Sequence, residues 1–129
     1  MNQGTQSYKD LVVWQKAIEL AKIVYELTRD FPAEERFGLV SQMRRAAVSI
    51  PSNIAEGQAR RTTGEFVQFI SHAEGSSAEL ETQLILAVEL SFCAKKSGLP
   101  AYERIDEIQR MLNALRRKLI SRSKLVTGH

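Results

Sequence analysis

The feature that most constrains this chain is a proline in the middle of a helical pattern. Between Val40 and Ile54, apolar residues recur at intervals of three and four, and the rhythm continues through Pro51. An interior proline costs about 3 kcal/mol, because it removes a backbone hydrogen bond and clashes with the preceding turn. Since the phase of the pattern is kept, we expect one helix over 34–59 that is kinked at Pro51.

An alternative interpretation starts a second helix at Asn53, with Glu56 in the capping-box position. Gly57 follows so soon that we favour the continuous helix. There, Ser49 and Asn53 would satisfy backbone groups that Pro51 leaves unpaired. The small residues around the proline favour a structural origin for this stretch, because small faces let two helices approach closely.

Three further stretches, 10–29, 63–96 and 101–121, show the same helical period. The first ends before Pro32, because the residue preceding a proline is pushed out of the helical region. Gly98 is placed to take the left-handed cap that ends the third helix. No alternating strand pattern and no Asn-Gly hairpin occur. The sequence therefore predicts an all-α fold, an antiparallel up-down four-helix bundle.

Composition indicates a single globular domain. The length of 129 residues fits one domain, and a hydrophobic fraction of 43% is enough for a packed core. We expect the bundle to cover 9–122, between a flexible N-terminal segment, 1–8, and a basic flexible tail, 123–129. The apolar run 84–88 is too short to cross a membrane, and the N-terminus lacks the features of a signal peptide. The lone Cys93 excludes an internal disulfide, so we expect a soluble, cytoplasmic protein.

Charge and apolar surface both point to contacts between helices or subunits. From 62 to 94 there are five glutamates and no Lys or Arg, whereas 108–129 holds six Lys or Arg and no acid. Such segregation serves to pair helices, to pair subunits or to hold a polyanion. The apolar residues that fall off the inner helix faces are Val12, Val13, Phe92 and Tyr102. A soluble helical protein usually buries such residues between subunits, so we expect an oligomer.

No constellation of residues predicts catalysis or metal binding. His72 has Phe69 three residues before it, where a di-iron bundle places a glutamate, and Ser71 points to a different helix face from His72. Cys93 is better explained as a small core or interface residue than as a nucleophile. The small residues at 75–77 favour close helix packing over phosphate binding. We expect no enzyme activity, no metal and no cofactor.

Basic clusters are the remaining candidates for function. They are Arg44-Arg45, Arg60-Arg61, Lys95-Lys96 and Arg116-Arg117-Lys118. Such groups bind phosphate backbones without an exact motif. The alternative is a solvated face that makes ion pairs with the third helix of a neighbouring subunit. An oligomer repeats each cluster around its axis, which strengthens the first interpretation.

A long compound motif consists of 42–57, Arg60-Arg61, Phe66, Phe69-Ile70 and 75–84. This motif resembles the four-helix-bundle proteins encoded in intervening sequences of bacterial 23S ribosomal RNA genes, often labelled S23 ribosomal proteins. The opening stretch, 8–17, is similar to the first helix of that family, and the resemblance covers about 8–122.

The resemblance implies an antiparallel bundle that assembles into a homopentameric ring or barrel. The best-understood relative, the accessory variability protein of diversity-generating retroelements, is a basic pentamer that binds nucleic acid and a partner reverse transcriptase. Most other members have no established activity. The positions matched to the family are Arg44, Arg45, Ser49, Ile50, Pro51, Asn53, Glu56, Gly57, Arg60, Arg61, Gly75 and Ser76. Glu74 departs from the pattern, because the family often has a basic or small residue there.

Two hypotheses follow. The first is an oligomeric, non-enzymatic accessory protein that binds the RNA or DNA backbone through Arg44, Arg45, Arg60, Arg61, Arg116, Arg117 and Lys118. The alternative is a protein-interaction scaffold with no nucleic-acid role, whose partner is a reverse transcriptase or another protein. In both, Pro51, Asn53, Glu56, Gly57 and Gly75 belong to a structural motif.

Overall fold

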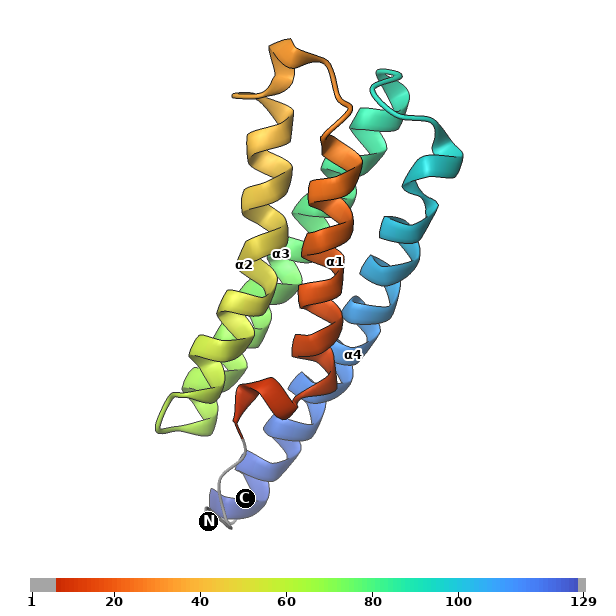
Figure 1. Ribbon diagram of the computed structural model, residues 1–129. Helices are drawn as coiled ribbons and strands as arrows, with labels where there is room; N and C mark the ends of the chain where they lie inside the picture. Colours follow the sequence, from red (N-terminus) through yellow and green to blue (C-terminus); the bar gives the residue numbers. More distant parts are fainter. Residues whose placement is uncertain (1–6, 128–129) are drawn as a thin grey trace.

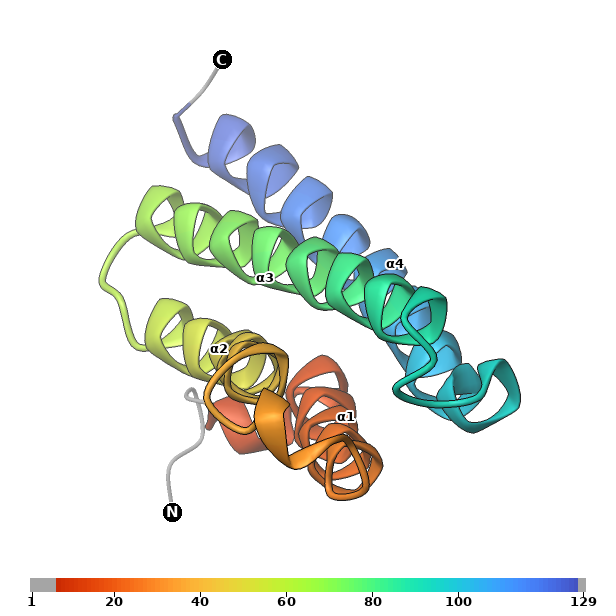
Figure 2. The ribbon, with the colours of Figure 1, turned by 90° about the horizontal axis from the view of Figure 1, so that it is seen from above.

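The computed structural model describes residues 7–127, with side chains through Ser123. Its helices are η1 (Tyr8–Asp10), α1 (Val12–Thr28), η2 (Ala33–Glu35), α2 (Leu39–Gln58), α3 (Thr63–Glu89) and α4 (Lys95–Thr127). Figure 1 shows that successive long helices run in alternating directions and lie side by side, with α4 also packed on α1. Seen from above, the pair α1–α2 faces the pair α3–α4 (Figure 2). The all-α bundle is confirmed.

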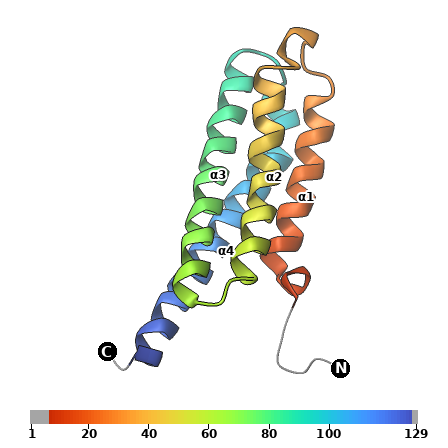
Figure 3. The same ribbon diagram turned by 90° about the vertical axis from the view of Figure 1, so that its left-hand side faces the viewer.

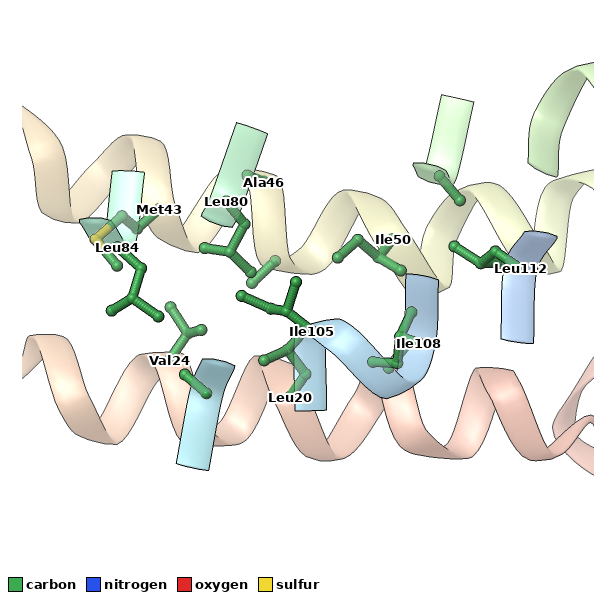
Figure 4. Close-up of a cluster of buried hydrophobic side chains, with 14 of the residues drawn as sticks. Leu20, Val24, Met43, Ala46, Ile50, Leu80, Leu84, Ile105, Ile108 and Leu112 are labelled. Atoms are coloured by element: carbon green, nitrogen blue, oxygen red, sulfur yellow. The ribbon is translucent and has the colours of Figure 1, made fainter. Parts of the chain in front are cut away.

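One apolar core runs along the bundle axis and draws on all four helices (Figure 4). Its fully buried large side chains include Leu20, Met43, Ile50, Leu80, Leu84, Ile105, Ile108 and Leu112. Burying each such side chain stabilises the fold by about 1.5–3 kcal/mol. The inner faces deduced from the three- and four-residue spacing are thus the faces that build the core.

Helix α2 is one helix that holds Pro51 inside it, and no restart occurs at Asn53. The amide of Asn53 donates to the carbonyl oxygen of Ser49 (2.8 Å) and to its Oγ (2.9 Å). The Ser49 hydroxyl in turn lies 2.8 Å from Oγ of Ser76 on α3. Pro51 leaves the carbonyl oxygen of Ala47 without its helical donor, and neither side chain binds that oxygen, so the expectation that Ser49 and Asn53 satisfy it is wrong. Asn53 binds the preceding turn of α2 instead, and the serine pair ties that turn to α3. The kink at Pro51 stays a prediction.

Two of the small residues in the motif differ in their surroundings. A Cβ on Gly57 would lie 2.6 Å from Cβ of Phe69 and 2.9 Å from Cδ1 of Phe66, so α2 and α3 approach closely because this residue has no side chain. A Cβ on Gly75 would meet no atom within 4 Å. Close packing within the chain therefore accounts for Gly57 and does not account for Gly75.

The start of α2 differs from the prediction. Instead of a helix from residue 34, the chain forms the short η2 turn and then passes through Gly38, whose φ of −111° and ψ of −112° are not helical. The helix begins at Leu39, whose backbone N–H donates to the carboxylate of Glu35 (3.2 Å). The side chain of Glu35 thus caps the start of α2, and the spacing of apolar residues gives no sign of this cap.

The connection between α3 and α4 also differs from the prediction that α3 reaches residue 96 with Gly98 as its cap. Ser91 takes the left-handed position, with φ of 62°, and its N–H donates to Val88 O (3.0 Å). The N–H of Phe92 donates to Ala87 O (2.9 Å), which completes a Schellman motif. Phe92 then packs on Phe31, with ring centroids 5.9 Å apart. The contact between Phe92 and Phe31 stabilises a helix end at Glu89, and the spacing of apolar residues does not predict this contact.

Gly98 and Pro100 lie inside α4 instead of before it. Pro100 is the sixth residue of α4, past the N–H groups that have no helical partner, so its missing N–H removes one backbone hydrogen bond. At its other end α4 continues to Thr127, past the expected end at Ser121. Of the two segments expected to be flexible, residues 1–6 and 128–129 lie outside the described residues. Within the part of the chain that is described, no helix combines the length and the apolar character needed to cross a membrane.

Candidate nucleic-acid-binding surfaces

The seven predicted binding residues lie in two places. Arg44 and Arg45 are on α2, toward the end of the bundle that carries the α1–α2 connection. Of the other five, Arg60 and Arg61 lie on the turn between α2 and α3, and the three on α4 begin at Arg116, which meets Glu74 near the middle of α3. Figure 3 shows that the last turns of α4 extend past the α2–α3 turn. We call this group the basic end; its residues are Arg60, Arg61, Arg116, Arg117 and Lys118.

Arg44 is bound by the chain itself. Its Nε donates to Oγ1 of Thr28 (2.9 Å), and its terminal nitrogen donates to the carbonyl oxygen of Tyr25 (3.3 Å). The guanidinium carbon also lies 4.5 Å from the centroid of the Tyr25 ring. The last carbonyls of a helix lack intrahelical partners and carry partial negative charge. Arg44 therefore caps the C-terminal end of α1 and joins it to α2.

Two arginines of the basic end are bound in a similar way. Arg60 pairs with Glu56 (3.1 Å) and lies over the Phe69 ring at 4.6 Å, beside the close approach at Gly57. Nε of Arg116 pairs with Glu74 of α3 (2.9 Å). Glu74 therefore does more than weaken a positive surface, because it links α3 to α4 through Arg116.

The remaining cations are exposed. Arg45, Arg61, Arg117 and Lys118 have no ion-pair partner among the side chains that the structure describes. Arg122 on α4 shares these properties and was missed as a site residue. The sequence feature that could have identified Arg122 is the stretch without Asp or Glu that begins at Ile108. Four free cations, Arg61, Arg117, Lys118 and Arg122, thus lie between the level of Glu74 on α3 and the α2–α3 turn or the last turns of α4.

Arg45 lines a different feature, an open hollow of about 470 Å³ on the outer side of α1 and α2. Its lining consists of Tyr25, Arg36, Phe37, Val40, Ser41, Arg44, Arg45 and Val48. We call it the α1–α2 hollow. Arg36 and Phe37 were not predicted as site residues, because they precede α2 in a stretch that was assigned to the helix itself.

The apolar surface also differs from the prediction. Of the four residues expected off the core, Val12 is 53% exposed, Val13 is buried, and Phe92 and Tyr102 are half-buried. Val13 belongs to the core because it lies four residues before Ala17 on the inner face of α1. The exposed large apolar residues are Val12, Tyr25, Phe37, Val48, Ile85, Leu86, Leu90 and Leu99.

The residues considered for catalysis are Cys93 and His72. Burial raises the pKa of the Cys93 thiol, which lowers its thiolate fraction and its reactivity. The ring of His72 is exposed and contacts Phe69 edge-on, with centroids 5.8 Å apart. Within the described residues, no three His, Cys, Asp or Glu side chains are grouped to hold a metal ion.

Comparisons with known proteins bear on both fold and function. A family model described as 23S rRNA-intervening sequence protein matches residues 9–114. The crystal structure of a protein of unknown function from the S23 ribosomal protein family, from Bacteroides thetaiotaomicron VPI-5482, is similar with a TM-score of 0.76 and 22% identity. The similarity covers 82% of this chain and 96% of that one, and at this identity it shows the fold alone. No curated protein matches the chain.

Proposed function

The chain belongs to the 23S rRNA-intervening sequence protein family, and we propose that it binds the phosphate backbone of RNA or DNA through its basic end. In this proposal it is a non-enzymatic accessory protein of the cytoplasm that acts as a homo-oligomer. The family resemblance favours a pentamer, with a reverse transcriptase or another protein as a further partner.

The observation that carries the proposal is the set of free cations on the later turns of α4 and on the α2–α3 turn. Arg117, Lys118 and Arg122 follow the Arg116–Glu74 pair on a stretch of α4 without acids, and Arg61 lies on the turn that precedes α3. Binding to phosphate would break no ion pair of the described residues, so these charges are available without a compensating loss. Contacts of this kind release counterions and do not depend on base sequence.

Assembly would strengthen this weak site. A homo-oligomer repeats the basic end around its axis, and once one copy has bound a strand, the next binds at a raised effective concentration. The exposed Ile85 and Leu86 on α3, with Leu90 directly after it, are the surface that such an assembly would bury.

Charge reversal tests the proposal. We expect wild-type protein to bind labelled duplex RNA and duplex DNA at low salt, with log affinity falling linearly as log salt rises. The variant R117E/K118E should lose at least about tenfold in affinity, whereas K95E/K96E, with the same charge change at the other end of α4, should bind normally. Arg116 is left unchanged because reversing it would place two carboxylates face to face at Glu74.

Two results would contradict the proposal: no binding at low salt, or equal affinities for the two double variants. Light scattering on the same samples separates the alternative function. If R117E/K118E changes the mass of the assembly and nucleic acid is never bound, the basic end serves subunit pairing and the protein is a scaffold. The observation that favours this alternative is that Arg44, Arg60 and Arg116 are bound by other residues of the chain.

A further inference from the structure

The α1–α2 hollow presents an aromatic ring to solvent. Phe37 is 89% exposed, whereas the next most exposed large apolar side chain of the described residues, Val12, is 53% exposed. It lies between η2 and Gly38, the residue that precedes the first turn of α2. Neither face of this ring is needed by the core of the chain, so the ring is available to an outside group.

Three arginines line the same hollow as the ring. Arg36, Arg44 and Arg45 line the hollow, and no carboxylate lines it. Arg44 is held by Thr28 and Tyr25, so its charge is fixed in place. Arg36 and Arg45 are exposed and have no ion-pair partner among the described side chains. The hollow therefore combines one fixed cation with two free ones.

A second hollow, of about 230 Å³, adjoins the first. Arg36, Val40 and Arg44 line both, and the second adds Arg29 and the buried Phe31. Here too the lining holds no carboxylate. The α1–α2 connection thus carries four arginines along one continuous depression, of a size that accommodates small-molecule groups.

A flat ring beside free guanidinium groups fits a ligand that is both aromatic and anionic. Bases stack on exposed aromatic side chains, and arginine forks match phosphate oxygens in pairs. We infer that the α1–α2 hollow binds a nucleotide unit, with its base stacked on Phe37 and its phosphate held by Arg36 and Arg45. The unit is either one residue of a single strand or a free nucleotide. This goes beyond the proposed function, in which the basic end holds phosphates alone.

The test compares ligands and variants of Phe37. The probes are a labelled single-stranded octa-adenylate, a duplex of the same length, and AMP. We expect F37A to weaken single-strand binding about tenfold, F37W to retain it, and duplex binding to stay unchanged, since paired bases are not free to stack on the ring. Leu99, also exposed on the surface, supplies the control L99A, which should bind both ligands like the wild type.

The two sources of the nucleotide are separated by the AMP titration. Saturable AMP binding that F37A abolishes identifies a free nucleotide as sufficient; octa-adenylate binding without AMP binding identifies a strand. The inference is overturned if neither binds, if F37A and wild type bind single strands equally, or if F37A weakens single strand and duplex alike. A lower assembly mass for F37A would also overturn it, because Phe37 would then contact a second copy. Duplex binding by R117E/K118E, compared with wild type, tests the basic end independently of Phe37.

Discussion

Replacing Gly57 by alanine gives a sharp test of how α2 and α3 pack. The added Cβ would lie 2.6 Å from Cβ of Phe69 and 2.9 Å from Cδ1 of Phe66. Cδ1 of Phe66 belongs to a ring that turns about its side-chain bonds, but Cβ of Phe69 is fixed to the α3 backbone. The two helices must therefore move apart at Gly57, about two turns along α2 from the serine pair that joins the same helices.

The expected magnitude follows from two opposing effects. Overpacking a close contact costs about 1–3 kcal/mol, and a 2.6 Å contact between two backbone-anchored carbons lies at the upper end. Alanine gains about 1 kcal/mol over glycine in a helix interior, and at most this amount at Gly57, the last residue but one of α2. The net loss in the free energy of unfolding is about 2 kcal/mol. With an unfolding entropy of about 2.1 cal/mol/K per residue over 129 residues, Tm falls by about 7 °C.

Gly75 supplies the control, because it is a glycine in the interior of α3 and a Cβ there meets no atom within 4 Å. G75A should raise the free energy of unfolding by about 1 kcal/mol, since the propensity gain is unopposed. Urea and thermal unfolding followed by far-UV circular dichroism, at one protein concentration, measures both variants. The reasoning is refuted if G57A is as stable as the wild type. It is also refuted if G75A is destabilised, which would place Gly75 against a surface outside the chain.

Three further predictions follow from single contacts. S91G should stabilise the protein by about 1 kcal/mol, measured by urea unfolding, because glycine adopts the left-handed φ of 62° without a side-chain penalty. R44M should destabilise it by about 1–2 kcal/mol in the same assay, because the hydroxyl of Thr28 and the carbonyl of Tyr25 lose their donor. At pH 8, iodoacetamide should modify Cys93 more slowly in the folded protein than in urea, because burial raises the thiol pKa; equal rates would contradict this.

Much of the fold could be predicted because the helical period and the core have one physical cause. Residues three and four apart share a helix face, so the apolar spacing through Pro51 identified both a continuous α2 and its buried side. The end of α3 could not be predicted in this way. Gly98 is the better left-handed residue by intrinsic preference, but Ser91 takes the position because the early turn lets Phe92 pack on Phe31. That contact joins residues far apart in the sequence.

For the candidate site, the sequence could not predict which arginines are free, and helix geometry explains why. Neighbouring residues on a helix point about 100° apart, so two adjacent arginines do not share surroundings. In Arg44-Arg45 and Arg116-Arg117, the first member is bound by the chain, through Thr28 in one pair and Glu74 in the other, and the second is free.

Arg60 and Arg61 follow the same division across the turn after α2, because Glu56 binds the first. The sequence shows each pair of arginines, but it does not show the residue that binds the first arginine of the pair. Reversing a whole cluster would therefore mix two effects, since the bound arginine supports the fold and only the free one is available to a ligand. Variants of Arg45, Arg61 and Arg117 alone separate binding from folding, and that is why the first arginine of each pair should stay unchanged in any test of nucleic-acid binding.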